Sequence, residues 1–118
     1  MTDPIIFRIS RVESDRLYQA AVDQDAAALT FWQTMWKDHQ DQQIACFICD
    51  EEPLPYPPHV MLLPDYENPI LYFMVVPVCD PCKMLPAAVR VSRSFKILKK
   101  MHKAKTGKNL EFRRMQLR

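Results

Sequence analysis

The chain has 118 residues, 48% of them apolar and 25% charged, and this length and composition predict a single globular domain. It contains only one glycine, Gly107, which excludes glycine-rich phosphate loops and dinucleotide-binding fingerprints. The net charge of +2 conceals an asymmetry, because residues 1–82 carry 4 basic and 13 acidic side chains whereas residues 83–118 carry 12 basic and 1 acidic.

The N-terminal third predicts a strand followed by an amphipathic helix. Residues 5–12 alternate apolar and polar side chains, as a half-buried strand does. From Ser14 to about Gln42, apolar side chains recur on one side of a helix. Asp25 falls at the edge of that side, so either the helix breaks near Asp23 or Asp25, which we favour, or the carboxylate has a partner. The side consists of Leu17, Tyr18, Ala21, Ala28, Trp32, Met35, Trp36 and His39, and we interpret its tryptophans as core or interface anchors.

The middle of the chain predicts a β-hairpin. A proline-dense loop over residues 53–58 is followed by two short β-rich runs, residues 59–63 and 70–76. The sequence PDYENP between them has the residues of a turn. The second run is apolar throughout, which predicts a strand covered on both faces by helices.

A second amphipathic helix is predicted from about residue 83 to 105. Its apolar positions advance by four and three residues, and a strongly cationic face lies opposite. Gly107 stands where a left-handed helix terminator belongs. The last residues, 109–118, predict either a strand that pairs with residues 5–12 or a basic arm. The apolar positions are Met84, Ala88, Val91, Phe95, Leu98 and His102.

All four cysteines of the chain belong to two C-x-x-C pairs, Cys46 with Cys49 and Cys79 with Cys82. Zinc takes four tetrahedral ligands, and each C-x-x-C turn can offer two thiolates to one ion. A thioredoxin-like redox pair is the alternative, but it requires a βαβ setting and no second pair. The pattern therefore predicts a structural Zn²⁺ bound by Cys46, Cys49, Cys79 and Cys82.

The order of the elements resembles the treble-clef class of zinc fingers. Residues 46–49 (CFIC) would be its knuckle, and residues 79–82 (CDPC) would open its helix after the hairpin. The resemblance covers residues 46–104 and implies an α+β single domain. Residues 1–45 then add an N-terminal strand and helix, and residues 105–118 form a basic C-terminal arm. Treble clefs serve many functions, so the resemblance fixes fold and metal only.

A further resemblance, to the HNH nucleases of that class, starts at His59 and does not extend beyond it. The family has Asp before this histidine, where this chain has Pro58, and a metal-binding His after the last cysteine, where this chain has Lys83. Asn68 lies too far from Cys79 to fit the pattern. Without a second set of metal ligands there is no site for a scissile phosphate, so we expect a protein that is not an enzyme.

Two functions remain as hypotheses. The first is binding of DNA or RNA through the cationic helix face. The second is a protein-interaction or self-association module, in which the acidic helix with its tryptophans docks a partner or basic and acidic faces of two chains pair. We expect no membrane contact and a cytoplasmic location, because no apolar run could span a bilayer and residues 1–10 lack the features of a signal peptide. The candidate nucleic-acid-binding residues are Arg90, Arg93, Lys96, Lys99, Lys100, Lys103, Lys105, Lys108, Arg113 and Arg114.

Overall fold

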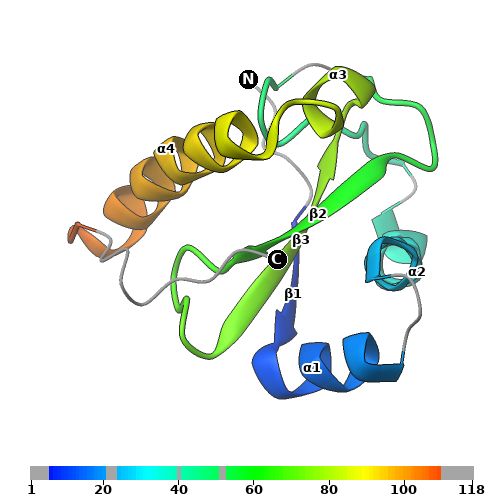
Figure 1. The fold of residues 1–118 in the computed structure, drawn as a ribbon, viewed down its shortest axis with the longest axis horizontal. Coiled ribbons are helices and arrows are strands. Elements are labelled where there is room, and N and C mark those ends of the chain that lie inside the picture. Colours follow the sequence, from blue (N-terminus) through cyan, green and yellow to red (C-terminus); the bar gives the residue numbers. More distant parts are fainter. Residues whose placement is uncertain (1–5, 21–23, 40, 51–52, 110–118) are drawn as a thin grey trace.

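The computed structural model describes residues 6–20, 24–39, 41–50 and 53–109, which form a small α+β domain (Figure 1). This part of the chain contains four α-helices, a short 3₁₀ helix (η1) and a three-stranded antiparallel sheet. The elements in chain order are β1 (Phe7–Ser10), α1 (Arg11–Ala20), α2 (Gln24–Trp36), η1 (Lys37–His39), β2 (His59–Pro64), β3 (Tyr72–Val78), α3 (Asp80–Lys83) and α4 (Ala87–Thr106).

The sheet has the order β1-β3-β2, and both pairings are antiparallel. Val75 of β3 lies between Phe7 of β1 and Leu62 of β2. The predicted hairpin is therefore confirmed. The predicted N-terminal strand is shorter than expected, because Arg11 already begins a helix, and its partner is β3. The alternative pairing with residues 109–118 lies almost wholly outside the described residues.

The central strand β3 contributes to two hydrophobic cores, one on each face of the sheet. Phe73 and Val75 join the core that contains residues of α2, whereas Met74 and Val76 join the core that contains Leu98 of α4. Alternation of this kind follows from the two-residue period of a strand. Helices α2 and α4 thus lie on opposite faces of the sheet, as the apolar run predicted (Figure 1).

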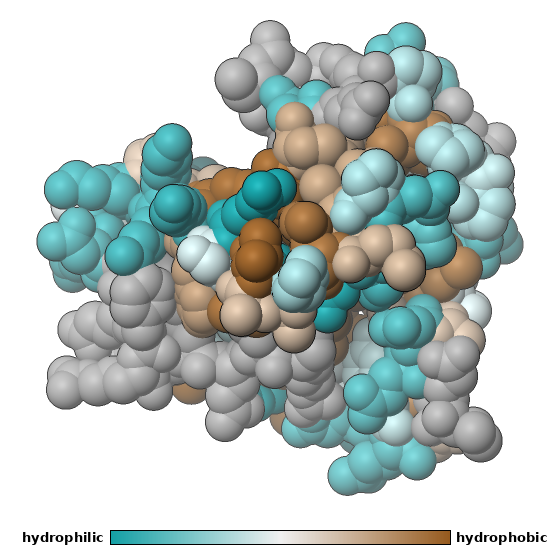
Figure 2. All heavy atoms as spheres, turned by 45° about the horizontal axis from the view of Figure 1, so that its top comes forward, coloured by the Kyte–Doolittle hydropathy of each residue, from teal (hydrophilic) through white to brown (hydrophobic). Residues whose placement is uncertain are grey.

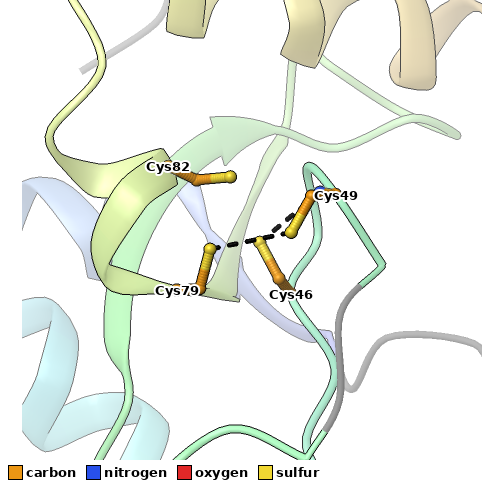
Figure 3. Close-up of side chains that lie close together, drawn as sticks. All are labelled: Cys46, Cys49, Cys79 and Cys82. Carbon is orange, nitrogen blue, oxygen red and sulfur yellow. Dashed lines mark hydrogen bonds between the residues drawn. The ribbon is translucent and has the colours of Figure 1, made fainter.

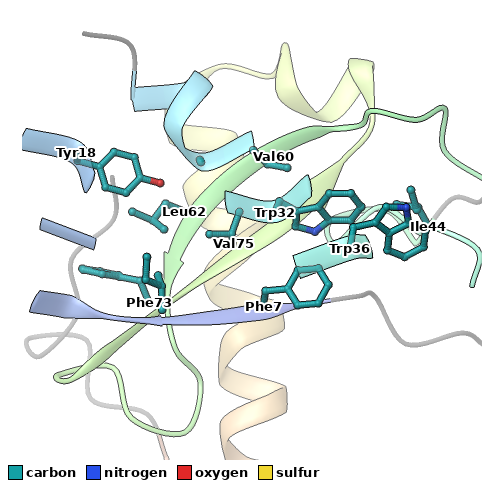
Figure 4. Close-up of a cluster of buried hydrophobic side chains, with 11 residues drawn as sticks. Phe7, Tyr18, Trp32, Trp36, Ile44, Val60, Leu62, Phe73 and Val75 are labelled. Carbon is teal, nitrogen blue, oxygen red and sulfur yellow. The ribbon is translucent and has the colours of Figure 1, made fainter. Parts of the chain in front are cut away.

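Aromatic side chains dominate the core on the α2 face (Figure 4). The rings of Trp32 and Trp36 stack with centroids 5.2 Å apart, and Phe7 meets Trp32 edge-on at 5.8 Å. Trp32 is fully buried and Trp36 is 5% exposed. The tryptophans are therefore core residues, and neither offers a ring to a partner.

The long N-terminal helix breaks, as we favoured. Helix α1 ends at Ala20 and α2 begins at Gln24, while Asp23 lies outside the described residues. Asp25 also has a partner, since its carboxylate lies 3.6 Å from Nζ of Lys83. Leu17 and Met35 were wrongly placed on the buried side, because a helical wheel drawn across a break loses its phase. They are 39% and 42% exposed.

The predicted helix over residues 83–105 is also interrupted. The one-turn helix α3 ends at Lys83, and α4 starts after Pro86. Proline lacks the N–H that would continue the helix and disfavours a helical residue before it, which accounts for the break. Met84 and Ala88 are consequently exposed and are not core residues. Gly107 ends α4 with φ = 74°, as predicted.

A network of charged residues fastens the turn between β2 and β3 to its neighbours. The buried Asp65 accepts a hydrogen bond from Nε of Arg8 at 2.7 Å, and Glu67 pairs with the same guanidinium at 2.6 Å. The hydrogen bond that Glu67 accepts from Arg8 holds the pKa of Glu67 below its usual range. Lys105 of α4 lies 3.9 Å from Glu67, and a ring nitrogen of His102 contacts the carbonyl of Tyr66. The turn thus connects β1 to the C-terminal half of α4.

Candidate metal centre

The four cysteines meet at one end of the sheet, where their sulfur atoms lie within 4.8 Å of one another (Figure 3). Cys46 and Cys49 come from the loop after η1. Cys79 follows directly on β3, and Cys82 lies in α3. Phe47 N–H donates to the carbonyl of Pro77 at 2.8 Å, which holds the first pair beside the end of β3. The sheet thus brings together two pairs that are far apart in the sequence.

Each pair is formed by a tight local turn. In the first pair, Asp50 N–H donates to the carbonyl of Cys46 at 2.9 Å, and Cys49 N–H lies 3.5 Å from Cys46 Sγ. In the second, Cys79 is the N-cap of α3 and its carbonyl accepts from Lys83 N–H at 2.9 Å. Residues three apart in a helical turn point to the same side, so the sulfurs of Cys79 and Cys82 both face the first pair.

The cysteines differ in how their surroundings affect ionisation. Burial acts to raise the pKa of Cys46, but hydrogen bonds from the backbone N–H groups of Cys49, Cys79 and Ile48 outweigh it and lower this pKa. Burial raises the pKa of Cys82, and contacts with the neighbouring thiols raise it further. Four thiolates this close together repel one another unless a cation lies between them. The cluster is therefore suited to a soft cation.

The spacing of the sulfurs also fits a metal ion. Tetrahedral Zn–S bonds of about 2.3 Å place the sulfurs about 3.8 Å apart. Cys49 Sγ and Cys79 Sγ are separated by 3.6 Å, and all four cysteines are free of disulfides. Cys46, Cys79 and Cys82 are buried, whereas Cys49 is exposed. The group can hold a metal ion, and four protein ligands leave no position for a substrate on a four-coordinate ion.

The predicted basic residues differ in their surroundings. Arg90 is half-buried and donates from Nη1 to the carbonyl of Lys83 at 2.8 Å. Lys105 faces Glu67, and Lys108 lies beyond the helix terminator. Arg113 and Arg114 lie outside the described residues. The other five are exposed within about 120° of the helix circumference, namely Arg93, Lys96, Lys99, Lys100 and Lys103. Hydrophilic side chains gather over the C-terminal half of α4, at the left of Figure 2.

His59, the starting point of the nuclease resemblance, is an exposed residue at the beginning of β2. Its Nε2 contacts the carboxylate of Asp80, the first residue of α3. This contact links the hairpin to the turn that carries Cys82. The structure therefore gives His59 a partner within the fold beside the cysteine cluster.

Sequence reasoning did not find the contacts of Lys83. Its Nζ donates to the carbonyl of Val60 at 2.8 Å, and β2 is an edge strand of the described sheet. Nothing local in the sequence indicates this contact, since the two residues are 23 positions apart. The exposure of Met84 could have been predicted from Pro86, which ends any continuous helical stripe.

Fold and site together define a small α+β domain with a zinc-finger-like group of four cysteines. Comparisons with protein-family models, with curated proteins and with solved structures find no match to this chain. Within the described ranges, none of the helices combines the length and the apolar character needed to cross a membrane.

Proposed function

We propose that this protein is a non-catalytic structural-zinc protein of the treble-clef type that binds nucleic acid through the exposed cationic side of α4. The order of its parts supports the treble-clef assignment. A cysteine knuckle comes first, the β2–β3 hairpin follows, and a helical turn then carries the second cysteine pair. The chain departs from a simple treble clef in having its C-terminal helix split by Pro86.

Zinc is the metal that this donor set suits best. Four thiolates in a closed group favour soft, tetrahedral ions, and zinc adds no redox chemistry that the fold would have to control. The bound ion would fix α3 against the knuckle, and α4 follows α3 after a short connection. In this proposal the metal sets the direction of the cationic helix.

One observation carries the nucleic-acid proposal. Four cations of α4, Arg93, Lys96, Lys100 and Lys103, follow one another at intervals of three, four and three residues and are all exposed. Side chains with this spacing form a straight row along a helix. A row of cations without interspersed carboxylates suits the phosphates of a nucleic-acid strand, whose neutralisation releases counterions.

The salt dependence of binding tests this proposal. Four or five phosphate contacts imply a slope of about −4 in log K against log salt, so affinity for duplex DNA should fall about 200-fold between about 50 and 200 mM salt. In the double variant Lys96→Glu, Lys100→Glu, the slope should shrink by about two units and the affinity should drop strongly. Fluorescence anisotropy with labelled DNA and RNA measures both quantities.

A matched control separates local contacts from net charge. Arg16→Glu with Lys37→Glu changes the net charge by the same amount at exposed residues of α1 and η1. This control should retain most of the affinity. The proposal fails if the protein binds neither DNA nor RNA at about 50 mM salt, or if both double variants weaken binding equally.

Self-association is a second candidate, favoured by the charge asymmetry of the sequence. The acidic side chains of the first 82 residues could face the cationic row of a second chain. Such a dimer would dissociate as salt rises, because exposed ion pairs are screened. Light scattering at low and high salt distinguishes nucleic-acid binding from self-association, because a protein that is monomeric under both conditions does not self-associate.

A further inference from the structure

An apolar residue precedes the cationic row of α4 on the same side of the helix. Val89 lies four positions before Arg93, so it stands at the head of the same line of side chains. It is 37% exposed. The line from Val89 to Lys103 is about 21 Å long, at 1.5 Å per residue. One end of the surface is therefore apolar, and the remainder is cationic.

Met84 is a second exposed apolar residue near the start of α4. Its side chain is 82% exposed, the highest value among the large hydrophobic residues of the described chain. The backbone around it is well anchored. The backbone N–H of Met84 donates to the backbone carbonyl of Asp80 at 3.1 Å. The preceding carbonyl, that of Lys83, accepts a hydrogen bond from Nη1 of Arg90 in α4 at 2.8 Å. Met84 therefore has a fixed backbone position, three residues before the first residue of α4 and two residues after the candidate metal ligand Cys82.

An apolar side chain gains little from contact with a charged phosphate, whereas it can pack against the flat face of a nucleobase. Apolar and aromatic side chains pack on unstacked bases, and the polarisable sulfur of methionine contacts aromatic rings favourably. In a duplex these faces are stacked on one another and hidden. A surface that joins exposed apolar side chains to a cationic row therefore suits a strand whose bases are unpaired.

We propose that Met84 and Val89 form a base-contacting patch and that the preferred ligand is single-stranded nucleic acid. This inference rests on the proposed function. The cationic row holds the phosphates, and the patch at its N-terminal end packs against one or two bases. Specificity for a particular sequence is not required, because every base offers a flat face.

The test uses the full-length protein with its metal and a labelled single strand of mixed sequence, compared with the blunt duplex of the same strand. The single strand should bind more tightly than the duplex. Met84→Ala should weaken single-strand binding about fivefold and leave the slope against salt unchanged, because no phosphate contact is lost. Duplex binding should not change. Met35→Ala, at an exposed methionine of α2 on the opposite face of the sheet, is the matched control and should bind like the unmodified protein.

A second substitution keeps a base-contacting side chain at this position. Met84→Phe adds a ring that stacks on bases, so it should bind the single strand at least as tightly as the unmodified protein. The proposal of a base-contacting patch is refuted if Met84→Ala has no effect on single-strand binding, or if Met84→Phe weakens binding as much as Met84→Ala does. Neither result would contradict phosphate binding by the cationic row. If neither strand nor duplex binds, the proposed function fails and this inference fails with it.

Discussion

Asp65 shows how one carboxylate organises the turn between β2 and β3. It is 1% exposed and accepts three hydrogen bonds, from Nε of Arg8 and from the backbone N–H groups of Glu67 and Asn68 at 3.1 and 2.8 Å. Its side chain thus replaces the backbone acceptors that a turn lacks. The same carboxylate fixes β1, because Arg8 belongs to that strand.

Replacing Asp65 with alanine should destabilise the fold markedly. The substitution leaves two backbone donors and Nε of Arg8 without their acceptor. Arg8 keeps its contact with Glu67 and can recover water at Nε, because its side chain is 42% exposed. We expect the free energy of unfolding to fall by about 2–3 kcal/mol, measured by urea denaturation. Asp41→Ala, at an exposed acidic residue, is the control and should change it by less than about 0.5 kcal/mol. Equal effects of the two substitutions would contradict this account of the turn.

At the scale of elements, the sequence predicted those whose signals are local. The hairpin was predicted because two β-rich runs flank a turn sequence, and the end of α4 was predicted because the chain has a glycine there. The exposure of Leu17 and Met35 was not predicted, because the break gives α1 and α2 independent helical phases and each helix therefore buries its own face. The partner of β1 and the pairing of Arg8 with Asp65 join residues more than 50 positions apart, and no local pattern encodes such contacts.

Strand β2 illustrates how an element can be protected at an open edge. In the described sheet it has β3 on one side only, and unpaired backbone groups at such an edge can recruit a strand of another chain. Lys83 places its ammonium group on the carbonyl of Val60, and Asp25 of α2 lies 3.6 Å from that group. The charged side chain of Lys83 therefore occupies the edge near the N-terminal end of β2.

Lys83→Met removes this charge but keeps most of the side-chain volume. We expect a loss of about 1 kcal/mol of stability and a new tendency to self-associate as concentration rises. Size-exclusion chromatography with light scattering over a range of concentrations measures the second effect. Lys37→Met, at an exposed lysine of η1, should remain monomeric under the same conditions. A monomeric Lys83→Met protein would show that the edge is protected by other means.

For the whole molecule, the four cysteines were identifiable from the sequence because their pairing leaves none over, and the structure brings them together as expected. The basic row was predicted by helical spacing. The exposure of Met84 and Ala88 was not predicted, because the continuous helix that the sequence favoured would have buried both residues. Pro86 changes this by starting a new helix whose phase is independent of α3.

Loss of the metal should unfold the domain. A structural zinc bound by four thiolates contributes on the order of 10 kcal/mol, which is comparable with the whole stability of a domain of this size. Cys82→Ser, or a strong chelator added to the native protein, should abolish the cooperative thermal transition and reduce the helical circular dichroism signal. Native mass spectrometry should show one bound zinc ion before treatment and none after. An unchanged melting curve would mean that the cysteine cluster does not stabilise the fold.

Because β3 lies between the two cores, tryptophan fluorescence should report on the state of the cysteine cluster. Phe73 and Val75 touch the core that holds both indole rings, while Met74 and Val76, their neighbours along the strand, touch the core that holds the sulfurs. We therefore expect a disturbance of the cysteine cluster to alter the environment of the tryptophans through this strand. If the cluster binds the proposed zinc ion, the intrinsic emission of Trp32 and Trp36 should shift to longer wavelength when a chelator removes it, so metal release can be followed without a label.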